Sequence, residues 1–397
     1  MHVLALSTLY PNAVNPRFGT FVARSLEGLA KHTDWDVTVI NPIGVPPIAF
    51  GKYRDLTDLE PVAVENGVTV HRPRFTLIPK FGARRNAGAI AKAVLPIVEE
   101  IHARQPIHVI DAEFFFPDGP AAAIIAEATG IPFSIKARGS DISQWKKLEY
   151  AREQILDAAE RADGLLAVSG ALADEMAQLG MDREKITVHY TGLDRDRFRP
   201  LRHTQLRAQL SRQLGFDLPD SAPMLACIGN LMERKGQDIA IKALPLLNNA
   251  RLVLVGKGEI EGDLRGLAEQ LGVADRVHFA GSVDHDVMPL VLSAADVMVL
   301  PTVSEGLANA WVESIACGTP VVTSDVGGVR EIITSEVAGR LVERTPEAVA
   351  EAVRAILNDP PDPDDVASVA ERFSWQNNAV ALAAHLDRMA RPRPDQA

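Results

Sequence analysis

The sequence predicts a protein of two α/β domains, each built on a doubly wound, mostly parallel sheet of the Rossmann-like type. Three observations support this fold class: the length of 397 residues, the alternation of short apolar runs with helical patterns, and a polar break near the middle of the chain. A chain of this length exceeds one ordinary hydrophobic core, so two domains are expected. Strands that are apolar along their whole length indicate parallel sheets covered by helices on both faces.

Apolar runs of strand length occur throughout both halves of the chain. The predicted strands of the first half are Val3–Ser7, Asp36–Ile40, Val68–His71, Ile107–Asp111, Phe133–Lys136, Leu165–Val168 and Ile186–His189. Those of the second half are Met224–Ile228, Arg251–Val255, Arg276–Phe279, Val297–Leu300 and Pro320–Thr323. Helical patterns lie between most of these runs, as at Phe21–Lys31 and Gly119–Thr129, which is the rhythm of parallel sheets.

A polar and arginine-rich segment, residues 194–222, separates the two halves. We place the domain boundary within it, so that residues 1–198 form the N-terminal domain and residues 199–375 the C-terminal domain. A last helix is expected at about 376–391, and it could pack on either domain, including back onto the first. Doubly wound sheets bind ligands at the carboxyl ends of their strands, so two such domains predict a deep interdomain cleft with ligand-binding ends on both walls.

The composition excludes several functional classes. The net charge of −11 makes general nucleic-acid binding a poor prediction. Two isolated cysteines, Cys227 and Cys317, make neither a disulfide framework nor a zinc site, which fits a reducing cytoplasm. No signal peptide and no run of about 20 apolar residues is present, so we expect a cytoplasmic protein with at most peripheral contact with the inner membrane.

The segment from Val297 to Gly328 carries the strongest indication of a ligand site. A strand at Val297–Leu300 is followed by a loop and by a predicted helix at Leu307–Cys317. The helix start near Glu305 would offer free backbone N–H groups to an anionic or hydroxyl-rich ligand. Glu313 follows eight residues later; in a continuous helix the two glutamates would lie roughly 12 Å apart, too far for an acid/base pair acting on one bond.

Two carboxylates at this separation suit the two ends of one long ligand, and a nucleotide sugar has hydroxyl groups at both ends. The alternative is that both glutamates are ordinary exposed helix residues, and the spacing alone leaves the two interpretations equally open.

At this point the chain resembles the family-4 retaining glycosyltransferases, which have the GT-B fold. The resemblance rests on the pattern from Glu305 to Glu313 followed by Ala-Cys-Gly-Thr-Pro-Val-Val and Gly327-Gly328. It extends to the motifs Gly229–Gly236, Leu254–Glu259, Val277–Gly281, Ala167–Ser169 and Tyr190–Asp194.

The resemblance implies an enzyme, a hexosyltransferase-type glycosyltransferase, with an acceptor-binding N-terminal domain and a donor-binding C-terminal domain. It implies catalytic roles for Glu305, Lys235, Arg138 and Asp141. The implied donor-binding residues are Gly19, Asn230, Arg234, Lys235, Gly258, Glu259, Glu305, Gly306, Leu307, Ala308 and Glu313. Within this set Glu305 would contact the donor sugar, Lys235 the diphosphate and Glu313 the ribose, while Gly19 would let its loop approach the phosphates.

The sequence departs from the family pattern at three positions. Asn230 stands where an arginine is usual, and Arg234 could supply the missing cation. Arg138 stands where a histidine is usual, in Arg138-Gly-Ser-Asp141, and an arginine there could bind phosphate or pair with Asp141. Thr191 replaces the usual asparagine.

The implied reaction moves a sugar from a nucleotide-diphosphate sugar to a hydroxyl of a glycan or lipid-linked acceptor, in bacterial surface polysaccharide, lipopolysaccharide or glycolipid biosynthesis. Retention of the anomeric configuration is expected, by a front-face mechanism. The alternatives are a GT-B nucleotide-sugar epimerase and a non-catalytic subunit that binds sugar nucleotides. No cofactor and no metal are expected, although Asp194-Arg-Asp196 and Asp284-His-Asp286 have the spacing of metal ligands.

A basic and apolar segment, Arg72–Arg85, reverses the acidic character of the chain locally. It places five basic side chains among Phe75, Leu77, Ile78 and Phe81. Such a segment can rest on anionic lipid, which would suit a lipid-linked acceptor. The alternative is a loop that packs its apolar residues on the domain and leaves its charges in water.

Overall fold

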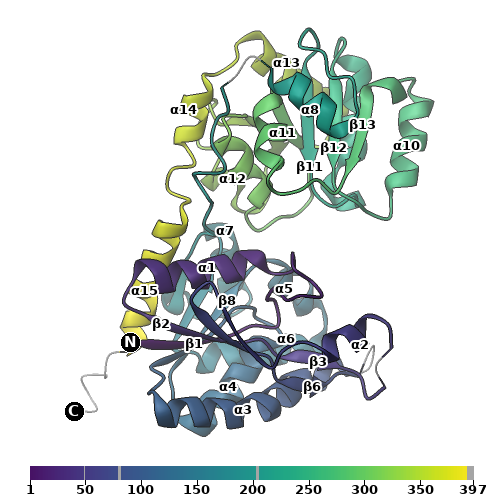
Figure 1. Cartoon of the computed structure of the whole chain (residues 1–397). Helices are drawn as coiled ribbons and strands as arrows, with labels where there is room; N and C mark the ends of the chain where they lie inside the picture. The colour runs from purple at the N-terminus through teal and green to yellow at the C-terminus, as the bar shows by residue number, and fades with distance from the viewer. Residues whose placement is uncertain (49, 79–81, 203–204, 391–397) are drawn as a thin grey trace. The chain divides into compact units, whose positions relative to one another are not determined.

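The computed structural model describes residues 1–48, 50–78, 82–202 and 205–390. The chain forms two compact units (Figure 1). Unit 1 comprises Met1–Gly192 together with the segment from Trp375, and unit 2 comprises Leu193–Ser374. The chain therefore changes unit before the 198/199 boundary placed from the sequence. Each unit is described by itself, and the cleft expected between the two domains stays a prediction.

Unit 1 is built on one large sheet with the strand order β10-β9-β8-β7-β1-β2-β5-β4. Every strand runs parallel to its neighbour except β4, which pairs antiparallel with β5. A separate pair, β3 and β6, is also parallel. The strands are β1 (His2–Leu6), β2 (Asp36–Ile40), β3 (Ile43–Val45), β4 (Val62–Glu65), β5 (Val68–His71), β6 (Arg74–Thr76), β7 (Val109–Ala112), β8 (Phe133–Ala137), β9 (Gly164–Ala167) and β10 (Ile186–Val188).

Helices cover both faces of this sheet, as the apolar strands predicted. All five residues of β1 are buried. Val3 and Ala5 pack in one core cluster with residues of α1 and α15, whereas Leu4 and Leu6 pack in a second cluster with residues of α3 and α4. The helices are α1 (Thr20–His32), α2 (Lys52–Thr57), α3 (Asn86–Arg104), α4 (Asp118–Thr129), α5 (Ser140–Ser143), α6 (Glu149–Arg161), α7 (Gly170–Gln178) and α15 (Trp375–Ala390).

The C-terminal helix α15 lies beside α1 in unit 1 (Figure 1). Asn378 joins it to the unit: its Oδ1 accepts a hydrogen bond from Ser25 Oγ at 2.8 Å, and its carbonyl oxygen lies 3.0 Å from His189 Nε2. Burial lowers the pKa of His189 to about 3, so the neutral ring donates from Nε2 to this carbonyl. Of the two arrangements considered for this helix, packing on the N-terminal domain is the one observed.

Unit 2 has a single six-stranded, fully parallel sheet with the order β13-β12-β11-β14-β15-β16. Its strands are β11 (Met224–Ile228), β12 (Arg251–Val255), β13 (Val277–Gly281), β14 (Val297–Leu300), β15 (Val321–Ser324) and β16 (Gly339–Val342). Its helices are α8 (Leu206–Leu214), α9 (Gln237–Ala243), α10 (Glu261–Gln270), α11 (Met288–Ala294), α12 (Asn309–Ala316), α13 (Pro346–Asn358) and α14 (Pro363–Ser368). The order reverses at β11, between β12 and β14, which is where ligands bind in such sheets.

Four strands of three or four residues escaped the sequence analysis. In β4 the side chains of Val62 and Val64 are exposed, since the strand lies at the edge of the sheet. β16 is an edge strand as well, and β3 and β6 are only three residues long.

Candidate functional site

Loops from separate parts of unit 2 meet at the carboxyl ends of β11, β12 and β14. Residues 229–236 follow β11, residues 256–259 follow β12, and residues 301–308 follow β14. Because these three strands are adjacent and parallel, their loops emerge at one edge of the sheet. Almost all of the donor-site residues named from the sequence lie on these loops.

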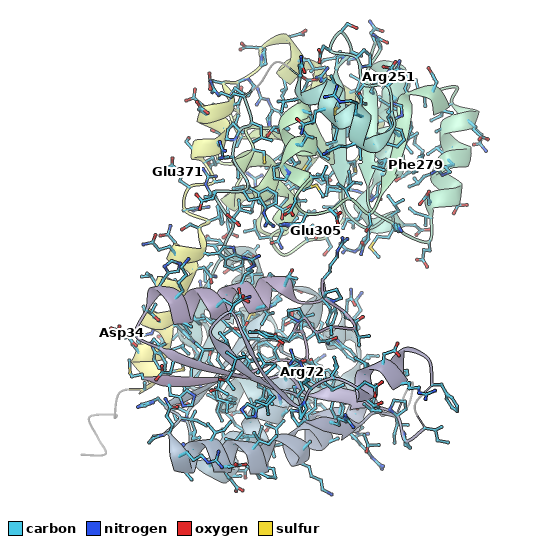
Figure 2. The ribbon with its side chains drawn as sticks, in the orientation of Figure 1. Asp34, Arg72, Arg251, Phe279, Glu305 and Glu371 are labelled. Carbon is cyan, nitrogen blue, oxygen red and sulfur yellow. The ribbon has the colours of Figure 1, made fainter. Side chains whose placement is uncertain are left out.

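The Glu305 carboxylate is the centre of this edge and lies on the loop after β14 (Figure 2). Its Oε1 atom accepts hydrogen bonds from Lys235 Nζ at 2.5 Å, Arg234 Nη1 at 3.0 Å and Thr302 Oγ1 at 3.1 Å. The side chains of Glu305 and Lys235 are 11% and 13% exposed, and that of Arg234 is 41% exposed. Two cations around one carboxylate give this three-residue cluster a net positive charge.

Backbone contacts hold the two loops of this cluster together. The carbonyl oxygen of Arg234 accepts hydrogen bonds from Thr302 Oγ1 at 3.0 Å and from the Val303 N–H at 2.8 Å. Thr302 was not singled out in the sequence, yet it is buried and contacts both Arg234 and Glu305. The arrangement fixes the separation between the two cations and the carboxylate before any ligand binds.

The segment after Glu305 is a loop and not the start of a helix. Helix α12 begins at Asn309, with Ala308 as its N-cap, so the helix predicted to start at Leu307 begins two residues later. The reason is that the Gly306 carbonyl accepts a hydrogen bond from the Gly328 N–H at 2.6 Å, which holds the chain outside the helix. Gly327 packs so closely here that a Cβ atom would lie 1.8 Å from the Glu305 carbonyl oxygen.

The pair Gly327-Gly328 of the family motif therefore has a structural role, because two glycines let this segment pack directly against the loop that carries Glu305. The backbone N–H groups of Gly306 and Leu307 belong to a loop and not to the helix start that the sequence predicted. Their expected contact with sugar or phosphate stays a prediction.

Glu313 lies within α12, in surroundings unlike those of Glu305. Its side chain is 15% exposed, and its Oε1 lies 3.6 Å from Nε2 of His285. The two glutamates therefore belong to one edge of the unit but have different partners, cations in one case and an imidazole in the other. Neither is the freely solvated helix residue of the alternative interpretation.

The loop after β12 interlocks with the loop after β11. A Cβ atom on Gly258 would lie 1.8 Å from the Leu231 carbonyl oxygen, so only glycine fits there. The Leu231 N–H donates to the Lys257 carbonyl at 3.1 Å. Glu259 and Asn230 are exposed beside this contact, and the Asn230 carbonyl accepts a hydrogen bond from Gln237 Nε2 at 2.9 Å.

In unit 1, Gly19 is the N-cap of α1 and adopts a left-handed conformation with φ of 72°. It is buried, and a Cβ atom would lie 2.4 Å from the Leu9 carbonyl oxygen. Glycine at this position therefore lets the loop after β1 pack on the start of α1. An approach of this loop to phosphate stays a prediction.

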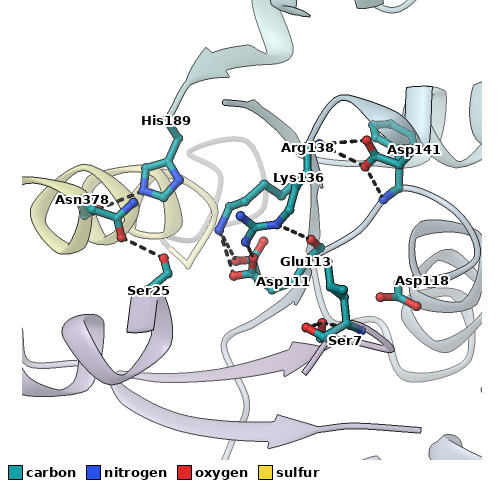
Figure 3. Close-up of polar contacts among 12 residues, drawn as sticks. Ser7, Ser25, Asp111, Glu113, Asp118, Lys136, Arg138, Asp141, His189 and Asn378 are labelled. Carbon is teal, nitrogen blue, oxygen red and sulfur yellow. Dashed lines mark hydrogen bonds and ion pairs between the residues drawn. The ribbon is translucent and has the colours of Figure 1, made fainter. Parts of the chain in front are cut away.

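Arg138, at the carboxyl end of β8, pairs with Glu113 and not through its side chain with Asp141. Its Nε donates to the Glu113 carbonyl at 2.8 Å and its Nη2 donates to Glu113 Oε2 (Figure 3). Its guanidinium also lies over the Phe21 ring. Asp141 is fully buried and accepts hydrogen bonds from the backbone N–H groups of Arg138 and Phe115. Asp141 thus orders the loop that carries Arg138, and burial raises its pKa.

Arg138 belongs to a buried group of four ionisable side chains, and the sequence analysis missed the other three members, Asp111, Glu113 and Lys136 (Figure 3). Lys136 Nζ lies 2.8 Å from Glu113 Oε1 and 3.8 Å from Asp111 Oδ2. Burial alone would raise the pKa of Glu113, but the pairing with Lys136 and Arg138 outweighs it and lowers the pKa to about 2. Burial raises the pKa of Asp111 to about 7.

The basic segment Arg72–Arg85 is only partly the surface that its sequence suggested. Arg72 is buried and its Nη2 lies 2.5 Å from Glu65 Oε1, and Phe75 is also buried. Alternation along β6 explains this, because it directs Phe75 inward and Arg74 outward. Arg74, Ile78, Arg84 and Arg85 are exposed, whereas Lys80 and Phe81 lie outside the described residues. Over the described part of the chain, no helix is long and apolar enough to cross a membrane.

Two family models match the chain and together span most of it. The model described as Glycosyltransferase Family 4 matches residues 19–197, and the model described as Glycosyl transferases group 1 matches residues 214–373. The first match falls almost wholly on unit 1 and the second on unit 2.

Among curated proteins, one relative is similar over nearly the whole chain and another over about half of it. TuaC of Bacillus subtilis, a glycosyltransferase assigned to teichuronic acid biosynthesis, is 27% identical over 96% of this chain and 97% of its own length. A GDP-mannose-dependent α-(1-6)-phosphatidylinositol monomannoside mannosyltransferase of Mycobacterium tuberculosis is 32% identical, over 54% of this chain and 58% of that protein.

Solved structures with the same fold cover nearly the whole chain. Sucrose-phosphate synthase of Thermosynechococcus elongatus has a TM-score of 0.73 at 20% identity, and 98% of each chain is covered. HepE of Anabaena, solved in complex with UDP-glucose, has a TM-score of 0.72 at 20% identity, covering 98% of this chain and all of HepE.

Proposed function

Because this chain belongs to the family 4, group 1 glycosyltransferases and has their GT-B fold, we propose that it transfers a sugar from a nucleotide-diphosphate sugar to a hydroxyl of a glycan or lipid-linked acceptor. The proposal places the donor on unit 2 and the acceptor on unit 1. Surface polysaccharide, lipopolysaccharide or glycolipid biosynthesis is the proposed context, which the similarity to TuaC supports.

The cluster of Lys235, Arg234 and Glu305 is the observation that carries the proposal. Its net positive charge suits a diphosphate, and Arg234 supplies the cation that Asn230 lacks. The hydrogen bond from Lys235 Nζ to Glu305 Oε1 orients the ammonium at this edge. The complex of HepE with UDP-glucose supports a donor of this class.

In the proposed reaction the bond between the sugar C1 and the leaving phosphate oxygen breaks, and a bond from C1 to the acceptor oxygen forms on the same face. The departing phosphate accepts the proton of the acceptor hydroxyl. Lys235 and Arg234 stabilise the negative charge that develops on the leaving diphosphate, and Glu305 contacts the sugar hydroxyls. This mechanism retains the anomeric configuration and needs no metal. The anomeric coupling constant of the product, measured by NMR, tests retention, and a coupling that indicates inversion would contradict the mechanism.

Glu313 would hold the ribose, and Gly258 and Glu259 would lie beside the nucleotide. A panel of UDP, GDP, ADP and their sugar conjugates tests this assignment by thermal stabilisation of the full chain. We expect stabilisation by one nucleotide series, a smaller shift in Glu313→Ala, and a wild-type shift in the control Glu351→Ala, which removes an exposed helical glutamate elsewhere in unit 2. No stabilisation by any member of the panel would refute the donor assignment.

We also propose a peripheral contact between unit 1 and anionic lipid, through a surface made of Ile48, Phe50, Ile78, Arg84 and Arg85. The three apolar side chains are 68%, 73% and 46% exposed. Because β3 and β6 are parallel, the residues directly after them lie at the same end of this pair. The Gly82 N–H donates to the Ile78 carbonyl at 2.9 Å and the Arg85 N–H to the Gly82 carbonyl at 2.8 Å, which keeps Ile78 near the two arginines. Apolar side chains beside basic ones suit an anionic interface, and a lipid-linked acceptor would be presented there.

Sedimentation with phosphatidylglycerol-containing vesicles tests the lipid contact. Each basic residue near such a surface contributes about 1 kcal/mol, so Arg84→Glu/Arg85→Glu should weaken binding by about 30-fold or more. Arg212→Glu, an exposed change on unit 2, should have little effect. Equal pelleting of the double variant and wild type would remove the proposal without touching the donor site.

A further inference from the structure

An imidazole that no family motif includes contacts the carboxylate proposed to hold the ribose. His285 lies on the loop between β13 and α11, and its side chain is 59% exposed. Its Nε2 atom is 3.6 Å from Glu313 Oε1, and its ring packs edge-on against Phe198 with centroids 5.0 Å apart. The ring is thus held between unit 2 residues that are far apart in sequence.

Arg197 determines which ring nitrogen of His285 carries the proton. Arg197 Nη1 lies 2.9 Å from His285 Nδ1. A guanidinium can only donate hydrogen bonds, so Nδ1 must present its lone pair. In the neutral ring the proton is therefore on Nε2, the nitrogen that faces Glu313.

Arg197 is itself fixed by two carboxylates. Its Nη2 lies 3.2 Å from Asp286 Oδ1, and its Nε lies 3.9 Å from Asp194 Oδ2. These two aspartates belong to the two Asp-x-Asp segments considered as metal ligands, and the structure gives both of them an arginine partner. The chain of contacts runs from Asp194 and Asp286 through Arg197 and His285 to Glu313.

We propose that His285, oriented by Arg197, is a positioning residue of the donor site that prepares Glu313 to recognise a ribonucleotide. The His285 Nε2–H faces one oxygen of the Glu313 carboxylate at 3.6 Å, a polar contact that favours one orientation of the carboxylate, so its other acceptor positions are presented to two ribose hydroxyls. The inference rests on the proposed role of Glu313 as the ribose ligand. It assigns a substrate preference, a nucleoside diphosphate with an intact 2′-hydroxyl over its 2′-deoxy counterpart.

Binding of UDP, GDP and ADP and of their 2′-deoxy forms, measured by calorimetry on the full chain, tests the inference. Loss of one well-oriented hydrogen bond between Glu313 and the ribose predicts that His285→Ala weakens binding of the preferred ribonucleotide by about tenfold, with a much smaller effect on the 2′-deoxy form. His285→Gln, whose amide can donate in place of Nε2–H, should restore most of the discrimination. Arg197→Met should reduce it, because no donor then faces Nδ1 and the tautomer is no longer fixed.

Glu313→Ala separates the failure of this inference from the failure of the proposed function. If Glu313→Ala lowers affinity and discrimination while His285→Ala leaves both at wild-type values, Glu313 holds the ribose and the inference about His285 is wrong. If Glu313→Ala changes neither, the proposed ribose ligand itself is wrong. A uniform loss of affinity for both nucleotide forms in His285→Ala, without rescue by His285→Gln, would indicate a merely structural residue and overturn the inference.

Discussion

Replacing Glu113 with glutamine removes one charge from the buried group of four in unit 1. Lys136 and Arg138 each lose a carboxylate partner, while Asp111 stays 3.8 Å from the Lys136 ammonium. Pairing with Lys136 and Arg138 lowers the pKa of Glu113 despite its burial, so the folded chain favours its charged form. Breaking a buried pair by removing one partner costs about 3–5 kcal/mol, and we expect Glu113→Gln to destabilise unit 1 by this amount.

Native-state hydrogen exchange measures this loss in unit 1 separately from unit 2. Amides of β8 should exchange through an opening that is easier by about 3–5 kcal/mol, whereas amides of β11 serve as an internal reference. Glu175→Gln is the matched control, because Glu175 and Lys146 form a pair at 2.6 Å whose side chains are 34% and 32% exposed. An exposed pair of this kind should contribute at most about 1 kcal/mol.

The double variant Glu113→Gln/Lys136→Met distinguishes a broken pair from a general disturbance of packing. Its destabilisation should be smaller than the sum of the two single effects by about 1–3 kcal/mol, since the first change already leaves Lys136 without its closest partner. Additive effects, or a Glu113→Gln effect no larger than that of Glu175→Gln, would refute the account of this network.

Three further outcomes are expected. Gly327→Ala should lower donor affinity or turnover by about 100-fold while the chain stays folded, because the added carbon displaces the Glu305 loop; kinetics with the preferred donor measure this. Lys235→Met should reduce kcat more than it raises KM for the donor, since the leaving group is most charged in the transition state. Burial raises the pKa of Asp118 to about 7, so the folded chain keeps a proton that the unfolded chain loses near pH 4, and stability falls as pH rises from about 4 to 7. Asp118→Asn should remove about 3 kcal/mol of this fall in urea-unfolding free energies between pH 5 and 8, because an amide beside Thr8 stays neutral.

The sequence predicted the two parallel sheets because their central strands are apolar throughout and alternate with helices. Strands such as β1 and β11 are buried on both faces, and a strand buried in this way has apolar residues at nearly every position, which the sequence shows. It could not predict β4, whose Val62 and Val64 face solvent at a sheet edge, since nothing in a short alternating run says which edge it joins.

The family motif predicted which residues belong to the donor site, but it did not predict the contacts between them. Glu305 and Lys235 were both named, but their hydrogen bond depends on two parallel strands placing residues 70 positions apart at one edge. Thr302 and His285 escaped because a single threonine or histidine in a loop carries no spacing pattern. The misplaced start of α12 has a similar cause: the Gly328 N–H that holds Gly306 outside the helix comes from a distant segment.

The buried network of unit 1 could not be read from the sequence. Asp111 and Glu113 at the end of one strand, and Lys136 and Arg138 at the end of the next, look like ordinary surface charges. They meet only because β7 and β8 are adjacent and parallel, which also explains why Arg138 binds Glu113 in place of the Asp141 carboxylate three residues away.

The most direct test of the account is to map where a nucleoside diphosphate binds, by hydrogen exchange of the full chain with and without saturating UDP, GDP or ADP. One nucleotide should protect the amides of residues 229–236, 256–259 and 305–313 at the carboxyl edge of the unit 2 sheet. Lys235→Met should weaken this protection at a fixed subsaturating concentration. Protection confined to unit 1, or no protection by any of the three at millimolar concentration, would contradict a donor site built on Glu305, Lys235 and Glu313.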